Sequence, residues 1–361
     1  MRVLYFTKYT RLGASSRLRS YQYFPTLEKH GIKVTVKPLF GDAYLHKLYA
    51  GQVKYLLVIK SYLKRLFILF TVFKYDTIVI EKELFPYFPP FFEGMLKLFG
   101  VKYVVDYDDA IFHNYDQSKN PIKKLLKNKI RHVMRYSTAV IAGNQYLADY
   151  AIEAGAKHVE IIPTVIDVNK YKIKRIYDPE TVTIGWIGSP TTLKYLKSIA
   201  AVLKELCAQH NINVHIVGSK EGIGLGINEK LIQWSEDTEA DIIRTFDIGL
   251  MPLTDSFWEK GKCGYKIIQY MGCAVPVVAS PVGVNSEIIV NGQTGYLAKT
   301  EFEWVDALKK YIVDKTIREE HGKNGRRRVE KNYNRDITAL KLIEILDLNK
   351  TISGRSKSKI K

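Results

Sequence analysis

The chain has 361 residues, 46% of them hydrophobic, and a formal net charge of +18. This length accommodates two domains with their own cores, and the composition excludes a disordered or fibrous chain. Its three cysteines, Cys207, Cys263 and Cys273, lack paired or metal-ligand spacing, which argues against a disulfide scaffold and favours a reducing cytoplasm. The charge calls for an acidic partner. Without a helix-turn-helix, zinc-finger or RNA-recognition pattern, we expect no nucleic acid and favour an anionic membrane surface, such as the inner face of the plasma membrane.

The first part of the chain is typical of a doubly wound α/β domain. Met1-Arg2 leads straight into the first strand, so no secretory signal is expected. A loop at 8–16 precedes a helix over 17–30, which Gly31 ends. Short strands rich in β-branched residues are predicted at 3–6, 33–37, 76–81, 102–106, 139–144 and from 159.

Residues 53–73 are apolar but interrupted by basic residues, which argues against a membrane-spanning helix. Apolar residues recur there at helical spacing: Leu56, Ile59, Leu63, Leu66, Phe67 and Phe70. Two interpretations compete: an amphipathic helix packed on the domain, or a helix lying in a membrane interface and attracted by anionic lipid. The aromatic run at 84–92 favours the membrane.

Carboxylates follow the predicted strand 102–106, in the sequence Asp106-Tyr107-Asp108-Asp109, and His113 comes shortly after. The spacing fits the Asp-x-Asp metal site of GT-A transferases. It also fits the Mg²⁺ site of haloacid-dehalogenase phosphatases, although that motif has Thr or Val where Ala110 stands. A histidine beside a carboxylate could also transfer a proton.

A second α/β domain follows a charged linker at 170–180. We therefore predict domains at 1–172 and 180–334. A strand at 182–187 leads into Gly188-Ser189-Pro190 and a helix, and glycine before a helix N-terminus lets an anion approach backbone N–H groups. Further strands are predicted at 214–217 and 247–252.

The most informative stretch is 258–297. Lys262, Lys266 and Gln269 are spaced four and three apart, so a helix there would carry them on one face. A buried strand at 277–279 and a glycine-bearing turn at 280–284 follow, and a short helix is predicted at 288–290.

This stretch resembles the donor-binding signature of the GT-B glycosyltransferases of family 4, the glycosyl transferases group 1. The signature has a Glu-x7-Glu helix, a Met-Ala-x-Gly-x-Pro-Val-Val-Ala-Ser strand and a Gly-Gly-x-x-Glu loop. This chain matches it at Met271, 276–280, Gly283 and Glu287, and departs from it where Gly261 and Gln269 replace the two glutamates. The resemblance covers most of the chain and implies two Rossmann-like doubly wound domains facing a cleft.

The resemblance also implies retaining transfer of a sugar from a nucleotide sugar, UDP- or GDP-linked, without a bound metal or cofactor. Ser189, Lys194 and Lys266 would hold the phosphates, Gln269 the ribose, and Glu259 could replace the glutamate missing at Gly261. The donor-site residues carried over are Gly188, Ser189, Lys194, Lys262, Lys266, Gln269, Gly283, Val284, Asn285, Ser286 and Glu287.

On the acceptor side, the family's cleft-facing loop is the favoured interpretation of the Asp106 segment, which makes His113 and Asp109 the catalytic candidates. Acceptor contacts are expected from Gly13, Arg17, Arg19 and Asn144. The plain alternative for Arg17 and Arg19 is an exposed helical turn.

In the family a last helix, here about 335–350, returns to the first domain. Residues 351–361 are polar and basic and are predicted to be disordered. A glycan or lipid-linked acceptor of cell-envelope polysaccharide synthesis is expected. Three alternatives remain: a GT-B nucleotide-sugar epimerase, a Mg²⁺-dependent phosphatase at Asp106 and Asp108, and a non-catalytic sugar-nucleotide-binding protein.

Overall fold

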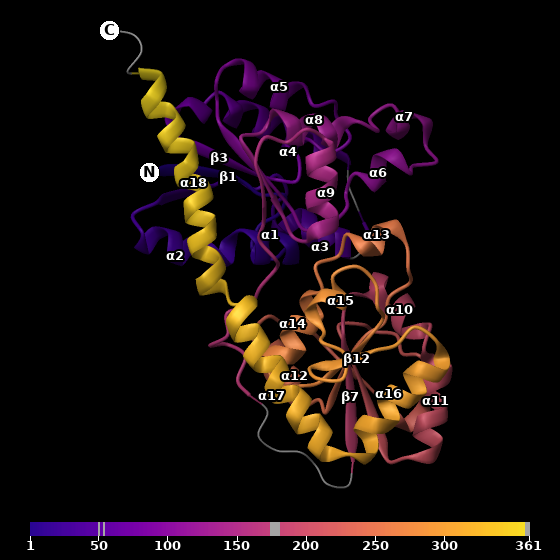
Figure 1. The fold of residues 1–361 in the computed structure, drawn as a ribbon. Coiled ribbons are helices and arrows are strands. Elements are labelled where there is room, and N and C mark those ends of the chain that lie inside the picture. Colours follow the sequence, from indigo (N-terminus) through magenta and orange to yellow (C-terminus); the bar gives the residue numbers. More distant parts are fainter. Residues whose placement is uncertain (50, 53–54, 174–180, 358–361) are drawn as a thin grey trace. The chain divides into compact units, whose positions relative to one another are not determined.

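The computed structural model describes residues 1–49, 51–52, 55–173 and 181–357, which form two compact units (Figure 1). Unit 1 contains residues Met1–Thr164 and those from Arg335 onward, and unit 2 contains Val165–Asn334. The first boundary therefore precedes the predicted linker at 170–180, of which 174–180 lie outside the described residues.

Unit 1 is built on a six-stranded parallel sheet of order β2-β1-β3-β4-β5-β6. Its strands are β1 (Arg2–Phe6), β2 (Lys33–Val36), β3 (Thr77–Glu81), β4 (Tyr103–Tyr107), β5 (Ala139–Ala142) and β6 (Val159–Ile161). The central strands β3, β4 and β5 are buried along their whole length, as expected of a parallel sheet covered by helices on both faces. All carboxyl ends share one edge, where Glu81 pairs in register with Asp106.

The helices of unit 1 surround this sheet (Figure 1). They are α1 (Ala14–Arg19), η1 (Tyr21–Tyr23), α2 (Phe24–Lys29), α3 (Asp42–Tyr49), α4 (Tyr55–Leu69), η2 (Val72–Lys74), α5 (Phe91–Leu98), α6 (His113–Asp116), α7 (Pro121–Lys124), α8 (Lys129–Tyr136), α9 (Gln145–Glu153) and α18 (Arg335–Lys357). The helix predicted over 17–30 is broken into α1, η1 and α2. The break lies at Ser20, whose backbone leaves helical geometry (φ −126°, ψ −68°), whereas Pro25 stands in the first turn of α2, where its missing N–H is tolerated.

The last helix, α18, packs on α2 and β3, as the predicted return to the first domain requires. It continues to Lys357, so residues 351–357 are helical and the prediction of a disordered tail is wrong for them. A helix that has already formed extends at little cost, because only its first turn is expensive to nucleate. Residues 358–361 lie outside the described range.

The helix predicted over 53–73 is α4, followed by the single turn η2, while positions 53 and 54 lie outside the described residues. In the described part of the chain, no helix combines the length and the apolar character needed to cross a bilayer.

Unit 2 is built on a second parallel sheet, of order β12-β11-β10-β7-β8-β9. Its strands are β7 (Val182–Ile187), β8 (Ile212–Val217), β9 (Glu229–Ile232), β10 (Ile248–Met251), β11 (Val277–Ala279) and β12 (Gly295–Leu297). Its helices are η3 (Pro190–Thr192), α10 (Leu193–Lys197), α11 (Ala200–Gln209), η4 (Gly226–Asn228), α12 (Glu239–Ile243), α13 (Phe257–Lys260), α14 (Tyr265–Gly272), α15 (Asn285–Ile288), α16 (Glu301–Val313) and α17 (Lys315–Asn332). The predicted strands at 182–187, 214–217, 247–252 and 277–279 are confirmed as β7, β8, β10 and β11.

Two helix boundaries in unit 2 differ from the prediction. Gly264 adopts a left-handed backbone (φ 61°) before α14, so Lys262 lies in a loop and does not share the helix with Lys266. The short helix predicted at 288–290 is α15, which begins at Asn285 and ends at Ile288.

Candidate functional site

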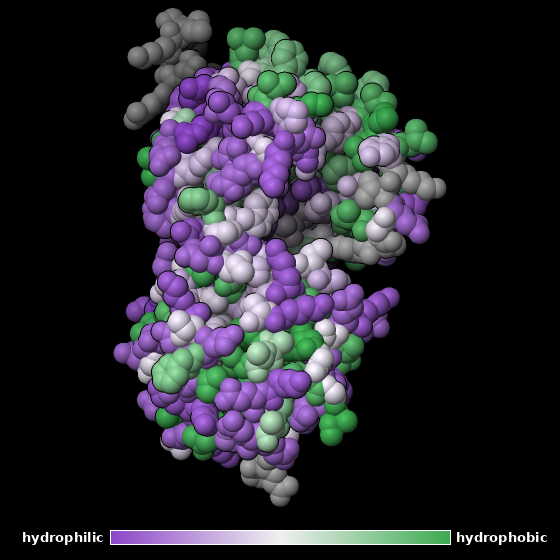
Figure 2. All heavy atoms as spheres, turned by 90° about the vertical axis from the view of Figure 1, so that its right-hand side faces the viewer, coloured by the Kyte–Doolittle hydropathy of each residue, from purple (hydrophilic) through white to green (hydrophobic). Residues whose placement is uncertain are grey.

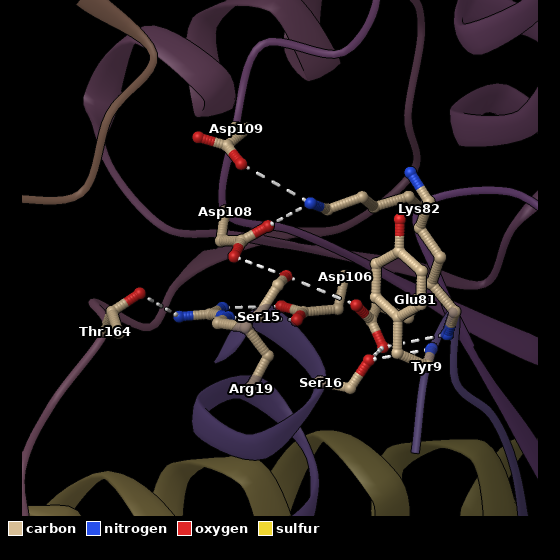
Figure 3. A network of polar contacts seen from close by, with 11 residues as sticks. Tyr9, Ser15, Ser16, Arg19, Glu81, Lys82, Asp106, Asp108, Asp109 and Thr164 are labelled. Atoms are coloured by element: carbon tan, nitrogen blue, oxygen red, sulfur yellow. Dashed lines mark hydrogen bonds and ion pairs between the residues drawn. The ribbon is translucent and has the colours of Figure 1, made fainter. Parts of the chain in front are cut away.

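Charged side chains gather at the carboxyl edge of the unit 1 sheet (Figure 3). We call Glu81, Lys82, Asp106, Asp108 and Asp109 the acid–lysine network. All five lie at or just after the ends of β3 and β4, which are neighbours in the sheet. Ligands of doubly wound sheets bind at this edge, so the position alone makes the network a candidate site.

Lys82 holds the network together. Its Nζ lies 2.8 Å from Asp108 Oδ1 and 3.4 Å from Asp109 Oδ2. Its backbone is left-handed (φ 67°), a conformation that costs a non-glycine residue about 1–3 kcal/mol. The next residue is fixed, because the Glu83 carboxylate accepts hydrogen bonds from Lys129 and from the Tyr115 hydroxyl. The surroundings thus impose the strained turn that brings Lys82 to the two aspartates.

Glu81 is buried beneath this ion pair. It accepts hydrogen bonds from Ser16 Oγ (2.6 Å), Ser15 Oγ (3.2 Å) and the backbone N–H of Lys8 (3.0 Å). Ser15 Oγ also lies 2.6 Å from Asp108 Oδ2, so the first turn of α1 is tied to both strand ends. Burial raises the pKa of Glu81, and the Lys82 ammonium opposes that shift.

The two arginines of α1 are not on an exposed turn, because the side chains of Arg17 and Arg19 are both buried. The Arg19 guanidinium grips Asp106 through Nε (2.9 Å) and Nη2, and Nη1 donates to Ile162 O (2.7 Å). Arg19 therefore joins α1 to β4 and to the end of β6 inside unit 1. Gly13 sits at the start of α1, where a Cβ would lie 2.5 Å from the Tyr9 side chain.

The electrostatics of the network favour the charged forms of Lys82 and Asp108. Burial alone disfavours the Lys82 ammonium, but Asp108 and Asp109 outweigh it and raise the pKa of Lys82. Burial likewise opposes ionisation of Asp108, and the cations of Lys82 and Arg19 outweigh it and lower its pKa. Asp109 reaches solvent most, with a side chain 35% exposed.

Metal binding at this Asp-x-Asp would have to displace protein cations, since Asp106 is paired with Arg19 and Asp108 with Lys82. Among the described residues, no group of three or more His, Cys, Asp or Glu side chains is arranged to hold a metal ion.

His113 begins α6. Its Nδ1 lies 2.9 Å from Asp116 Oδ1 and its Nε2 lies 2.8 Å from the Tyr146 hydroxyl, so both ring nitrogens have partners. The carboxylate that the structure places at His113 is Asp116, whereas Asp109 lies at Lys82. Asn144 caps α9, since its side-chain oxygen accepts from the Leu147 N–H at 3.0 Å. This capping bond accounts for a buried asparagine at that position.

In unit 2, lysines and aromatic rings gather after β7. We call Trp186, Lys194, Tyr195, Lys262 and Lys266 the lysine–aromatic cluster. Lys266 Nζ lies 4.6 Å from the centre of the Trp186 ring, while Lys194 and Lys262 lie 4.8 and 5.9 Å from that of Tyr195. Gly188 follows the same strand, where a Cβ would lie 2.4 Å from the Trp186 ring, and the exposed Ser189 comes next. Three lysines, one strand end and a glycine turn thus come together.

Lys266 is the most perturbed cation of this cluster. Burial, with a smaller contribution from the positive charge of Lys262, lowers the pKa of Lys266 to about 7. Within the described residues, no carboxylate lies within ion-pair distance of its ammonium. A half-buried cation beside an aromatic ring and another lysine is a candidate for binding an anion.

Glu259 adjoins this cluster from α13. The hydroxyls of Tyr195 and Ser256 both donate to its carboxylate. Burial would raise the pKa of Glu259, but these two hydrogen bonds outweigh it and lower that pKa. A carboxylate whose ionised form is favoured therefore lies two residues before Gly261.

Gln269 has a different role from the predicted one. Its side chain is buried, and Nε2 donates to the Tyr171 hydroxyl at 2.9 Å. That hydroxyl donates to Glu239 Oε1 (2.9 Å), and Trp234 Nε1 donates to Glu239 Oε2 (2.8 Å). The ribose contact predicted for Gln269 is corrected accordingly, because its amide is buried in a network that ties α14 to Tyr171 and α12.

The turn at 280–284 lies against α13. Gly283 has φ 54°, and a Cβ there would meet the Lys260 backbone at 2.8 Å. Asn285 is buried, and its Nδ2 closes the turn by donating to Ser280 O (3.0 Å). Val284 is buried too, whereas Ser286 and Glu287 are exposed. Of the residues carried over from this loop, Ser286 and Glu287 present side chains to solvent.

Sequence reasoning missed several members of both sites. Lys82 and Glu81 follow a β-branched strand just as Asp106 does, so the same signal was present at both strand ends. Trp186 and Tyr195 carry apolar patterns typical of core positions, and no signal in the sequence marks them as platforms for lysines.

Comparison with known proteins supplies the context for these sites. Residues 181–314 match the family model of the glycosyl transferases group 1. A curated relative, D-inositol 3-phosphate glycosyltransferase of Rhodococcus jostii, is 23% identical over 218 residues, covering 51% of this chain and 47% of the relative. The chain thus spans about half the length of the curated relative it matches.

Solved structures match nearly the whole chain. A sucrose-phosphate synthase from Thermosynechococcus elongatus superposes with a TM-score of 0.70 at 13% identity, over 95% of this chain and 97% of that chain. The Anabaena protein HepE in complex with UDP-glucose superposes with a TM-score of 0.67 at 16% identity, over 96% and 99%. The predicted GT-B fold is thereby confirmed, and the resemblance to the group 1 transferases is confirmed for residues 181–314. Assignment to family 4 stays a prediction.

Proposed function

Because the chain has the GT-B fold and carries a glycosyl transferases group 1 domain, we propose that it transfers a sugar from a nucleotide sugar to a glycan or lipid-linked acceptor. The proposed reaction retains the anomeric configuration, needs no protein-bound metal and serves cell-envelope polysaccharide synthesis. The protein would act in the cytoplasm, at the periphery of an anionic membrane. UDP is the first nucleotide to test, since UDP and UDP-glucose are the ligands named for HepE.

The observation that carries this proposal is the lysine–aromatic cluster. The nucleoside diphosphate leaving group gains negative charge as its bond to the anomeric carbon breaks, and fixed cations stabilise that charge in the transition state. Lys266 lies over the Trp186 ring, where its ammonium could meet the diphosphate. Lys194 and Lys262 add charge from two other segments. Backbone groups and other side chains of unit 2 would bind the base and the ribose.

In unit 1, we assign the acceptor to the acid–lysine network. Asp109 is its most exposed carboxylate, and Lys82 fixes its direction. A carboxylate accepts hydrogen bonds from sugar hydroxyls, so Asp109 fits a polyol. His113, with Asp116 and Tyr146 on its two nitrogens, would have to exchange a partner before moving a proton.

Two alternatives fit the structure less well. The phosphatase requires Mg²⁺ at carboxylates that Arg19 and Lys82 already neutralise. The non-catalytic interpretation relied on Gly261 and Gln269, but Glu259 brings a carboxylate to the cluster from the neighbouring helix turn.

The test is calorimetric titration with UDP, GDP, ADP and CMP, with and without Mg²⁺. We expect one nucleoside diphosphate to bind regardless of metal. A charge-assisted hydrogen bond contributes about 1.5–3 kcal/mol, so Lys266→Ala should weaken binding by about 10- to 150-fold. Lys204→Ala, an exposed lysine on α11, is the control and should bind like wild type.

Release of nucleotide that depends on added glycan or lipid-linked acceptor separates transfer from epimerisation. Binding to none of the four nucleotides, or equal binding by Lys266→Ala, would refute the donor site.

A further inference from the structure

Helix α4 departs from the usual pattern of an amphipathic helix in a water-soluble protein. Such a helix buries its apolar side and turns charged residues outward. In α4, the Arg65 side chain is buried and 1% exposed, whereas Leu56, Leu63 and Phe67, half a turn away around the axis, are 78%, 52% and 70% exposed. Water is an unfavourable neighbour for that outer side.

Polar groups fasten the inner side of α4 to the sheet. Arg65 Nη2 donates to the carbonyls of Thr7 (2.7 Å) and Lys37 (2.8 Å), which directly follow β1 and β2. The guanidinium also lies 5.0 Å from the centre of the Phe6 ring. Tyr62 donates to Pro86 O at 2.7 Å. Helix α4 is therefore fixed at the carboxyl edge of the unit 1 sheet, the edge that carries the acid–lysine network.

The exposed apolar residues of α4 continue onto neighbouring elements and form what we call the apolar face. Phe73 after α4 meets Phe99 after α5, with ring centres 6.4 Å apart. In the loop before α5, Phe85 meets both Tyr62 and Phe92, and Phe92 stacks on Phe88. The exposed members are Leu56, Ile59, Leu63, Phe67, Phe70, Phe73, Tyr87, Phe88, Phe91, Leu98, Phe99, Ile122 and Leu125. In Figure 2, hydrophobic residues gather along the upper side of unit 1, where Figure 1 places α5.

Basic residues predominate around the apolar face. Residues 55–75 contain Lys60, Lys64, Arg65 and Lys74 and no acidic residue. Residues 117–136, which include α7, likewise contain basic residues and no acidic one. Lys123 of this segment lies 4.5 Å from the centre of the Tyr87 ring, which links α7 to the aromatic loop. A second copy of the chain would bring like charges together, whereas an anionic bilayer offers both an apolar interior and the opposite charge.

We propose that the apolar face is a docking surface for the interface of an anionic lipid bilayer, with α4 as its main inserted element. Because Arg65 fixes α4 at the carboxyl edge of the sheet, docking holds the acid–lysine network close to the lipid surface. The acceptor is then a lipid-linked sugar. The identification of the acceptor as a lipid-linked sugar rests on the proposed function. The docking is argued only from the structure of α4 and its neighbours.

Vesicle flotation tests the docking. Full-length protein is mixed with vesicles of phosphatidylcholine alone, or of phosphatidylcholine with an equal amount of phosphatidylglycerol. We expect flotation with the anionic vesicles and a loss at high salt. Lys60→Gln/Lys64→Gln should weaken partitioning about 25-fold, since each basic residue near the surface contributes about fivefold. The matched control Lys204→Gln/Lys309→Gln replaces exposed lysines of unit 2 and should float like wild type.

The apolar contribution is tested with Leu56→Ser/Leu63→Ser/Phe67→Ser, which should weaken partitioning by more than about 100-fold. Its control, Ile227→Ser/Phe302→Ser/Val313→Ser, removes equally exposed apolar side chains from unit 2 and should not change flotation. Both variants should keep the wild-type melting temperature and UDP affinity, because none of these side chains is buried.

Three results would overturn the docking: wild type that floats with neither vesicle, a triple variant that floats as well as wild type, or a dimer that the triple variant dissociates while lipid stays unbound. Failure of UDP binding would refute the donor site in unit 2 and leave the flotation result intact.

Discussion

Lys266 offers a direct test of the donor site, because its pKa of about 7 makes binding depend on pH. In the free protein the ammonium is half protonated at pH 7, and about 1% protonated at pH 9. A bound diphosphate restores the charged form by placing anions beside it. If only the protonated form binds, affinity for UDP falls about fiftyfold between pH 7 and 9, or about 2.3 kcal/mol. The ligand's own terminal phosphate ionises near pH 6, so its charge is nearly constant over this range.

Calorimetry at pH 8, in two buffers of different ionisation enthalpy, measures the proton that binding takes up. We expect about 0.9 proton per UDP, because about nine-tenths of Lys266 is neutral at that pH. Lys266→Arg carries a permanent charge, so proton uptake should vanish and affinity should become flat from pH 7 to 9. Lys197→Arg, an exposed position on α10, is the control and should keep the wild-type profile. Equal wild-type affinity at pH 7 and 9 without proton uptake would refute the reasoning.

Three further substitutions test the internal polar contacts, each by urea unfolding of the unit that contains it. Lys82→Met leaves two aspartates without their cation and should lower the free energy of unfolding of unit 1 by about 3 kcal/mol at pH 8. The decrease should be smaller at pH 5, where the aspartates can take up protons. An equal decrease at both pH values would contradict the ion pair. Arg65→Met leaves buried carbonyls without their donor and should lower the free energy of unfolding of unit 1 by about 3 kcal/mol. Lys64→Met, at the exposed neighbouring position, should lower it by less than about 0.5 kcal/mol. Gln269→Glu introduces the residue of the family signature but places a second carboxylate at the Tyr171 hydroxyl, which already donates to Glu239. The free energy of unfolding of unit 2 should fall by about 2 kcal/mol, and adding Glu239→Gln should restore most of it.

Short runs of β-branched residues between turn signals sufficed to predict all six strands of the unit 1 sheet and four of the six strands of the unit 2 sheet. The apolar pattern was less successful for helices. The helix predicted over 17–30 is interrupted at Ser20, and the left-handed Gly264 delays α14, because an apolar pattern does not contain the backbone geometry of single residues. The strands β9 and β12 were not predicted, because they contain only four and three residues.

The sites were predicted less fully than the fold. Lys266 was predicted from its helical spacing and from the family resemblance, whereas its position over the Trp186 ring became visible only in the structure. Lys82 was missed because its contact with the two aspartates depends on a left-handed backbone, which cannot be predicted from the residue type. Gln269 was assigned to the ribose because a single sequence does not reveal that Tyr171, far away in the chain, takes its amide.

The helix α18 has a consequence for how the protein is made. Unit 1 is discontinuous: its sheet comes from the first 164 residues, but the helix that covers α2 and β3 begins at Arg335. Its buried side chains include Ala339, Leu342 and Leu346, and Thr338 Oγ1 lies 3.0 Å from the Tyr23 hydroxyl. A ribosome therefore releases the sheet of unit 1 first, then all of unit 2, and only afterwards the helix that closes the first core. Until α18 is synthesised, the apolar residues of unit 1 that it covers stay exposed. We therefore expect unit 2 to complete its folding first and unit 1 to be the part that binds a chaperone.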